Sequence, residues 1–243
     1  MKGATPAGTA TEQEASRWVR SMFGRIAPRY DLANHILSLN LDRVWRARTV
    51  QRVRPVLERP DARTLDICCG TGDLLLALNK RARHPVMGSD FCHPMLTAAR
   101  TKITGRGLGC RLFEADALNL PLADASLDLV TVAFGFRNLA NYQAGLAEMR
   151  RVLKPDGLAA ILEFSQPDAA LFAKLYRFYS RNILPVLGGA LSGSRDAYRY
   201  LPESIGKFPS APELAREMRG AGFRSVDFTR MTGGAVALHI GTK

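Results

Sequence analysis

Two glycines, Gly70 and Gly72, lie between an apolar run and a helical pattern in the stretch Leu65–Leu74. Glycine permits a sharp turn and lets a ligand approach the main chain. The free amides and the macrodipole at a helix start favour negative charge, and the hydroxyl of Thr71 adds a donor. A dinucleotide site prefers a third glycine at position 75, where this chain has Leu75. The loop therefore predicts a cofactor without a pyrophosphate, such as S-adenosylmethionine; a purely structural turn is the alternative.

Acidic residues follow the next two apolar runs. Asp90 closes the second run, where an acid accepts both ribose hydroxyls in nucleoside-binding folds of this type. Asp116 follows the third run, where it could accept from the adenine amino group with the Ala117 amide facing the ring. Either aspartate alone is more often a helix cap or a turn residue, but the three signals together predict S-adenosylmethionine. The expected cofactor-binding residues are Asp66, Gly70, Thr71, Gly72, Asp90, Phe91, Asp116, Ala117 and Ala133.

The loop after the fourth apolar run, Ala133–Leu139, is where such enzymes usually select the acceptor. It has neither the Asn/Asp-Pro-Pro-Tyr run that holds a flipped base nor a Pro-Cys nucleophile, which argues against a nucleic-acid substrate. The net charge of +12, with 11 basic and 5 acidic side chains in residues 1–60, would suit nucleic acid or an anionic membrane. A solvated, arginine-rich surface explains the same charge, so charge alone decides nothing.

Short apolar runs alternate with helical patterns from Arg63 onward, which is typical of a parallel sheet with crossover helices. The last two runs are too close in sequence for a parallel crossover and predict an antiparallel hairpin. We therefore predict an α/β, Rossmann-like class I methyltransferase fold with a seven-stranded, mostly parallel sheet. The expected strands are Thr64–Cys68, Pro85–Ser89, Cys110–Glu114, Leu127–Ala133, Leu158–Phe164, Phe223–Thr229 and Ala235–Ile240, and the expected helices are Gly72–Lys80, Pro94–Thr104, Tyr142–Leu153 and Pro212–Ala221.

Three segments frame this core. Residues 1–11 are small and polar and predict a disordered lead-in, and residues 12–60 predict an N-terminal helical cover. The methyltransferase domain is expected to span residues 61–243, with a lid or insertion at 170–205 after the fifth strand. Both the cover and the insertion could lie over the carboxyl ends of the strands, where open α/β sheets bind ligands.

Four cysteines, Cys68, Cys69, Cys92 and Cys110, form no Cys-x-x-Cys pair and are interpreted as reduced thiols, with no metal site expected. No apolar run approaches the roughly 18 residues that span a bilayer. We expect a cytoplasmic protein, with association with an anionic membrane surface left open. The basic N-terminal quarter and the apolar stretch Leu171–Tyr179 would make that contact, although a buried helix explains the stretch as well.

Several longer motifs extend the pattern over residues 23–243. They are Tyr30-Asp31-x-x-Asn34-x-x-Leu37-Ser38, Asp42-Arg43-x-Trp45-Arg46, Leu65–Asp73, Phe134-Gly135-x-Arg137-Asn138, Arg151-Val152-Leu153-Lys154-Pro155-x-Gly157, Asp196-x-Tyr198-x-Tyr200-Leu201-Pro202-x-Ser204-Ile205 and Gly234-x-Val236-Ala237-x-His239-x-Gly241. With these motifs the chain resembles the ubiquinone/menaquinone biosynthesis C-methyltransferase family. It departs at Asn40, where the family tends to have glycine, and at Ala133, which replaces a hydroxyl residue near the cofactor.

The resemblance implies methylation of a ring carbon of a polyprenylated quinol. We expect demethylmenaquinol as the acceptor, with a methoxy-polyprenyl-benzoquinol as a second. Arg137 and Asn138 are the expected catalytic residues, which stabilise the quinolate or orient a water, although the pair could simply brace the loop. Tyr198 and Tyr200 are expected to line the acceptor pocket or to form lid core. His239 is a possible second base but fits a structural role better.

Other functions remain open from sequence alone. A methyltransferase for another small molecule would share the cofactor motifs, and so would a non-catalytic subunit of a quinone-synthesis complex. A nucleic-acid-binding module is the third alternative, although no nucleic-acid partner is expected. The sequence leaves a homodimer open.

Overall fold

A seven-stranded sheet runs through the molecule in the order β3-β2-β1-β4-β5-β7-β6. The computed structural model describes residues 3–167, 174, 179, 182 and 195–243. The five parallel strands are β1 (Thr64–Ile67), β2 (Met87–Asp90), β3 (Leu112–Glu114), β4 (Leu127–Ala133) and β5 (Leu153–Phe164). The predicted class I architecture is confirmed.

The sheet closes with the predicted antiparallel hairpin. β6 (Val226–Met231) and β7 (Val236–Thr242) are joined by the single turn η4 (Thr232–Gly234), which is too short for a parallel crossover. β7 inserts between β6 and β5 and pairs antiparallel with both. β5 is longer than predicted: it begins at Leu153, whereas the predicted strand begins at Leu158.

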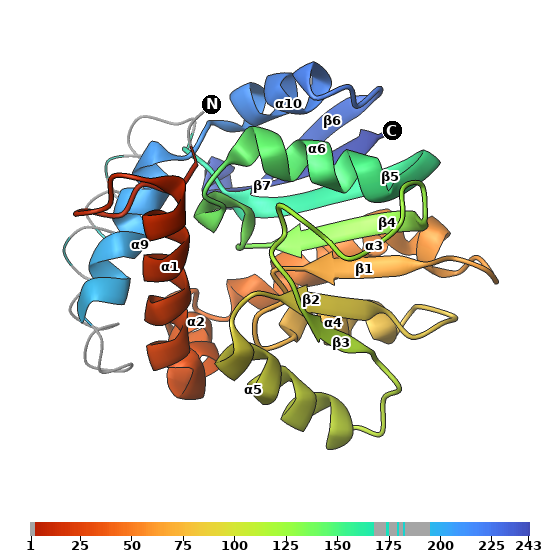
Figure 1. Cartoon of the computed structure of the whole chain (residues 1–243), viewed down its shortest axis with the longest axis horizontal. Coiled ribbons are helices and arrows are strands. Elements are labelled where there is room, and N and C mark those ends of the chain that lie inside the picture. Colours follow the sequence, from red (N-terminus) through yellow and green to blue (C-terminus); the bar gives the residue numbers. More distant parts are fainter. Residues whose placement is uncertain (1–2, 168–173, 175–178, 180–181, 183–194) are drawn as a thin grey trace.

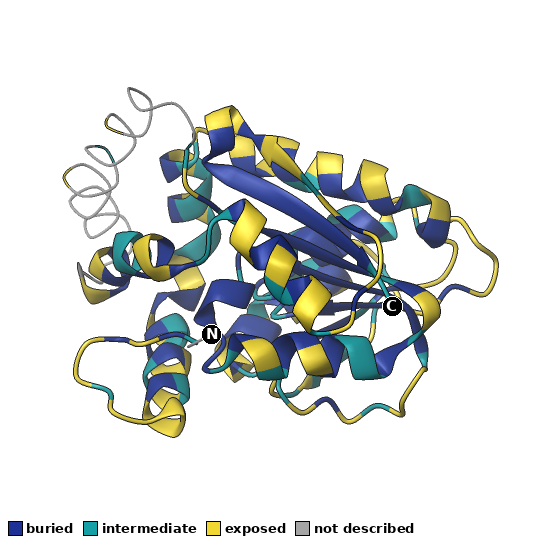
Figure 2. Cartoon of the chain, turned by 90° about the horizontal axis from the view of Figure 1, so that it is seen from above, coloured by how far each residue is buried: buried dark blue, intermediate teal, exposed yellow. Residues whose placement is uncertain are grey.

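Helices cover both faces of the sheet and bury it. α6 (Tyr142–Val152) and α10 (Ala211–Gly220) pack on one face, and α3 (Leu41–Leu57) and α4 (Asp73–Asn79) pack on the other. Along β5, Ala159 and Ile161 face the first layer, whereas Ala160 and Leu162 face the second, as the twofold side-chain period of a strand requires. Figure 2 shows the buried strands between helices whose outer surfaces are exposed.

A third layer stands at the carboxyl ends of the parallel strands. It comprises α1 (Glu12–Ile26), η1 (Ala27–Arg29), α2 (Tyr30–Leu37) and α9 (Arg195–Lys207). The crossover helix α5 (His93–Thr104) packs against β2 and β3 and meets this layer with its first turn. Figure 1 shows α1, α2 and α9 gathered at this end of the sheet. Buried side chains of this layer and of α5 form a separate core that includes Val19, Met22, Met95 and Tyr198. The helices therefore cover the edge where a ligand would bind.

The N-terminal stretch is attached to this layer more closely than its polar composition suggests. Ala4 is buried, and its N–H donates to the carbonyl of Leu139 at 2.7 Å. α1 begins with a capping box in which Thr11 accepts from the Glu14 amide. In the described part of the chain, no helix is long and apolar enough to cross a membrane.

Candidate active site

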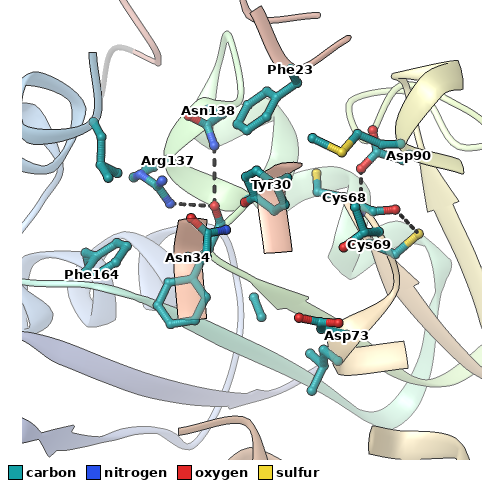
Figure 3. Close-up of a pocket in the computed structure, with 18 of the residues that line it drawn as sticks. Phe23, Tyr30, Asn34, Cys68, Cys69, Asp73, Asp90, Arg137, Asn138 and Phe164 are labelled. Atoms are coloured by element: carbon teal, nitrogen blue, oxygen red, sulfur yellow. Dashed lines mark hydrogen bonds between the residues drawn. The ribbon is translucent and has the colours of Figure 1, made fainter. Parts of the chain in front are cut away.

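A cavity of about 430 Å³ opens at the carboxyl ends of β1, β2 and β4, beneath the N-terminal helices. Twelve of the thirteen residues predicted from sequence line it. They are Asp66, Gly70, Thr71, Asp90, Phe91, Asp116, Ala117, Ala133, Arg137, Asn138, Tyr198 and Tyr200. The thirteenth, Gly72, is the N-cap of α4 in the same loop and does not line the cavity. Figure 3 shows the glycine-loop side and the Arg137 side facing one another across the cavity.

The loop between β1 and α4 needs its glycines for two different reasons. Gly70 has φ +54°, and a Cβ there would meet nothing within 4 Å, so the space above it is open. Gly72 has φ +87° and supplies the turn into α4, and a Cβ there would lie 3.3 Å from the Cβ of Ala99 on α5. The loop thus exposes its main chain to the cavity at Gly70 and packs against α5 at Gly72.

Asp90 holds this loop in place. One carboxylate oxygen accepts from the Gly70 amide at 2.8 Å, and the other accepts from the Cys92 amide at 2.9 Å. Burial raises the pKa of Asp90 to about 6, against the opposing effect of these hydrogen bonds. Each oxygen keeps a lone pair for a further donor, and Asp90 lines the cavity.

Asp66 is the most buried acid beneath the loop. Its Oδ1 accepts from the Thr131 hydroxyl at 2.7 Å, whereas its buried Oδ2 has no hydrogen-bond partner among the described residues. Burial raises the pKa of Asp66 to about 7. A buried oxygen without a partner is costly, so this atom marks a place for a ligand or a water.

The third predicted acid, Asp116, lies in a turn. Asp116 is exposed, and its Oδ1 accepts from the Leu118 amide at 2.9 Å. Ala117 is buried beside it, and both residues line the cavity. Asp116 thus follows β3, as predicted, and lines the cavity.

Thr71 has a partner that the sequence did not indicate. Its hydroxyl contacts Asp31 of α2 at 2.5 Å, and Lys102 of α5 pairs with the same carboxylate at 2.5 Å. Lys102 also pairs with Asp73 at 2.8 Å. This network links the N-terminal cover to the glycine loop. The Thr71 hydroxyl therefore already has a hydrogen-bond partner, Asp31, in this structure.

A second set of contacts ties α3 to the same loop. Arg46 pairs with Asp42 on its own helix and approaches Asp73 at 3.5 Å. Trp45 donates from its ring nitrogen to Thr232 at 2.9 Å and packs against Phe134 with ring centroids 5.8 Å apart. The motif around Trp45 and Arg46 therefore positions the cover over the cavity.

Arg137 occupies the opposite wall and is 5% exposed. Its Nη1 donates to Glu163 of β5 at 2.9 Å and to the carbonyl of Phe134 at 2.5 Å. The guanidinium lies over the Phe164 ring at 5.2 Å, and its Nε has no hydrogen-bond partner in the described chain. Glu163 is 1% exposed and also accepts from the Arg137 amide at 3.2 Å. Burial raises the pKa of Glu163, and the charge of Arg137 opposes that shift.

Sequence reasoning missed Glu163. The only available signal was one acid near the end of an otherwise apolar strand, and such a residue usually marks the exit of a strand into solvent. Its role becomes visible when β5 lies next to β4, so that the carboxylate reaches the loop that follows β4.

Asn138 and Tyr200 are brought together from distant parts of the chain. The Tyr200 hydroxyl donates to Asn138 Oδ1 at 3.1 Å, and Asn138 Nδ2 reaches the Phe134 carbonyl at 3.4 Å. Burial raises the pKa of Tyr200 to about 12, so the phenol is protonated at neutral pH. Tyr30 and Asn34 of α2 complete this wall, as the close-up in Figure 3 shows.

His239 lies away from the cavity. It is 2% exposed in β7, where a ring nitrogen lies 2.8 Å from the Ala211 carbonyl. Burial lowers the pKa of His239 to about 4, so the ring is neutral at physiological pH. The structural role that the sequence favoured fits this position.

Comparison with known proteins assigns the chain to a family. A model of the ubiE/COQ5 methyltransferase family matches residues 9–243. The chain belongs to the ubiE/COQ5 methyltransferase family. Demethylmenaquinone methyltransferase of Thermus thermophilus is 48% identical over 91% of this chain and 100% of its own length. The protein of the same name from Deinococcus radiodurans is 45% identical over 96% and 95%. A ubiquinone/menaquinone biosynthesis C-methyltransferase of Geotalea uraniireducens is 40% identical over 95% and 98%.

Solved structures share the fold at low sequence identity. A methyltransferase from Thermotoga maritima, described as S-adenosylmethionine-dependent, superimposes with a TM-score of 0.66 at 18% identity over 92% of this chain and 99% of its own. The [4+2]-cyclase SpnF superimposes with a TM-score of 0.68 at 16% identity over 98% of each chain. These likenesses support the fold and carry no statement about substrate.

The family and fold imply S-adenosylmethionine as the methyl donor, and the residues of the cavity fit it. The space above Gly70 admits a ligand against bare main chain, and the buried Oδ2 of Asp66 lacks a partner among the described residues. Asp90 and Asp116 follow the second and third strands at the same edge of the sheet. The family and the named relatives make this chain an S-adenosylmethionine-dependent C-methyltransferase.

Proposed function

We propose that this protein transfers the methyl group of S-adenosylmethionine to a ring carbon of a polyprenylated quinol. Demethylmenaquinol is the proposed acceptor, and 2-methoxy-6-polyprenyl-1,4-benzoquinol is the second. The names of the relatives support this substrate class. The observation that carries the proposal is one cavity that joins the glycine loop and its acids to a wall built by Arg137, Asn138 and Tyr200.

The donor end of the cavity would be held by the predicted cofactor-binding residues. Asp90 would accept from the ribose hydroxyls, Asp116 from the adenine amino group, and the Gly70 main chain would contact the amino-acid part. Asp66 Oδ2 would receive a donor from the ligand or from a bridging water. When bound, S-adenosylmethionine supplies an electrophilic methyl group on a sulfonium.

At the acceptor end of the cavity, Arg137 would stabilise the deprotonated quinol. A quinol carbon becomes nucleophilic when its neighbouring hydroxyl loses a proton, and a guanidinium beside the oxygen stabilises that anion. Glu163 accepts from Nη1, whereas Nε is buried and has no protein partner among the described residues, so Nε would be the donor left for the quinolate once the acceptor is bound. Arginine is a poor base, so the proton would leave through a water that Arg137 and Asn138 orient. The apolar walls formed by Phe134 and Phe164 exclude bulk water and strengthen this interaction.

The proposed roles of Arg137 and Asn138 predict a split between binding and turnover. Asn138→Ala should bind S-adenosylmethionine with unchanged affinity by calorimetry and lose about tenfold or more in kcat, since one positioning hydrogen bond is removed. Arg137→Ala should behave likewise with a larger loss. Because Arg137→Ala leaves Glu163 buried without a partner, Arg137→Lys is the companion variant that preserves the charge. Full turnover in Asn138→Ala and Arg137→Ala together would contradict the assignment.

The proposal includes contact with an anionic membrane surface, because an isoprenoid tail resides in a bilayer. The segment Leu171–Tyr179, which the sequence offered for that contact, lies outside the described residues except at positions 174 and 179. A homodimer is not required by this proposal, since residues of a single chain line the cavity.

Product analysis tests the reaction directly. Purified protein receives labelled S-adenosylmethionine and each of the two reduced acceptors, and mass spectrometry with fragmentation locates the methyl group. We expect label on a ring carbon of menaquinol. Label on an oxygen or on an amine would favour a methyltransferase for another small acceptor. Tight donor binding without transfer to either quinol would favour the non-catalytic alternative.

A further inference from the structure

The exposed large apolar side chains of the described chain all gather in one place. They lie on α2, on α3 and on the turn between these helices: Leu32, Ile36, Leu39, Leu41 and Val44. Leu39 is 81% exposed at the tip of the turn, where it and Asn40 both have positive φ, at 53° and 60°. We call this set the α2–α3 tip. An exposed apolar cluster of this kind marks an interaction surface.

An arginine shares a helix face with the exposed apolar residues on each side of the tip. Arg29, Leu32 and Ile36 follow at spacings of three and four along η1 and α2, so they share one helix face. Leu41, Val44 and Arg48 repeat the same spacing on α3. On this face of each helix the apolar residues are near the turn and the arginine is farther from it. This order suits apolar side chains among acyl chains with guanidinium groups at the lipid phosphates.

Charge complementarity supports the same partner. Between residues 25 and 48, every position is described, and the exposed side chains are apolar, basic or neutral polar: Arg25, Pro28, Arg29, Leu32, Ile36, Leu39, Asn40, Leu41, Arg43, Val44, Ala47 and Arg48. The two acids of this stretch, Asp31 and Asp42, are turned inward and paired with Lys102 and Arg46. Within residues 25–48, no exposed acid would therefore oppose an anionic surface.

The tip is continuous with the active-site cavity. Leu37, Ser38 and Leu39 line the cavity as well as the turn, so an apolar path leads from Arg137 and Tyr30 to the tip. A substrate with a long apolar tail needs such a path, because the ring must enter the cavity while the tail stays in lipid. We infer that the α2–α3 tip docks this enzyme on an anionic lipid bilayer and admits the quinol tail from it. The docking itself stands without the proposed substrate, whereas the tail path rests on the proposed function.

Vesicle co-sedimentation of the full chain tests the docking. Wild-type protein should pellet with phosphatidylglycerol/phosphatidylcholine vesicles and far less with phosphatidylcholine alone, and the binding should weaken with salt. The double variant Ile36→Asp/Val44→Asp, which spares every cavity-lining residue, should lower the partition coefficient about tenfold or more. Arg29→Glu/Arg48→Glu should lower it comparably. Gln143→Asp/Ala147→Asp, which adds the same charge on exposed positions of α6, should bind as wild type.

Two outcomes would overturn the docking. One is wild-type protein that stays in the supernatant, or tip variants that pellet as well as the α6 control. The other is a wild-type dimer that the tip variants convert to monomer with no change in vesicle binding, which would assign the tip to a second copy of this chain. Turnover of a quinol with a single isoprene unit, in buffer without lipid, separates this inference from the proposed function. Equal turnover by wild type and tip variants, with membrane binding lost, supports docking; absent turnover with intact docking contradicts only the substrate.

Discussion

At the scale of single residues, the site depends on buried charges that are held by other groups. The sequence predicted cavity-lining residues such as Gly70 and Asp90, because each lies at the end of a predicted strand or shortly after it. It could not predict Glu163 or the contact between Asp31 and Thr71, because these pairs join residues 26 and 40 positions apart. Such pairing depends on which strands and helices become neighbours, and a pattern within one segment does not contain that information.

Donor affinity should depend on pH through Asp90. The ionised carboxylate is the better acceptor for ribose hydroxyls, and burial raises its pKa to about 6. Affinity for S-adenosylmethionine should therefore be full above that pH and fall as pH decreases through about 6, by at most about tenfold per pH unit. Calorimetry between pH 5 and 8 measures this. The profile of Asp90→Asn should be flatter and weaker throughout; an affinity for wild type that is constant over this range would contradict the role.

Glu163 should matter for stability as well as for turnover. Replacing one partner of a buried ion pair leaves the other charge uncompensated, at a cost of about 3–5 kcal/mol. Glu163→Gln should lower the free energy of unfolding in urea by that order and reduce kcat with little change in donor affinity. Glu203→Gln is the control, because its pair with Lys207 is exposed and is worth less than about 1 kcal/mol. Equal stability of the two variants would show that the buried pair is not charged as described.

At the scale of elements, local patterns predicted where strands and helices lie, and the errors are at their ends. The sequence placed the start of the fifth strand at Leu158, but β5 begins at Leu153 and passes through Pro155 and Gly157. That stretch looks like a turn because proline and glycine are common there. Leu153 pairs with Leu127 across a register shift, so tertiary contact with β4 extends the strand.

The loop after β4 should be sensitive to one methyl group. A Cβ on Gly135 would lie 2.5 Å from the Cβ of Cys68, which is backbone-proximal and cannot swing away. Gly135→Ala should displace the loop that carries Arg137 and lower stability by about 1–3 kcal/mol, with a loss of turnover. Gly206→Ala is the matched control: nothing lies within 4 Å of its new Cβ in helix α9, so it should be neutral or stabilising by up to about 1 kcal/mol. Urea unfolding and turnover of both variants compare them.

At the scale of the molecule, two groups of segments meet at one edge of the sheet. The residues predicted to hold a nucleoside lie at the ends of β1, β2, β3 and β4, while the N-terminal helices and α9 carry the aromatic and apolar wall. The sequence suggested that the N-terminal helices cover the carboxyl ends of the strands, but it did not predict the separate core that includes Met22, Met95 and Tyr198. The same N-terminal helices present the α2–α3 tip outward, so one segment both closes the cavity and offers a surface to lipid.

The most direct test of the account is calorimetric titration of S-adenosylmethionine into Asp90→Ala beside the wild-type protein. The account requires that this carboxylate holds both the glycine loop and the ribose of the donor. It predicts that the variant, folded by circular dichroism, shows little or no heat of binding at donor concentrations that saturate wild type. Binding as tight as that of the unaltered protein would contradict it.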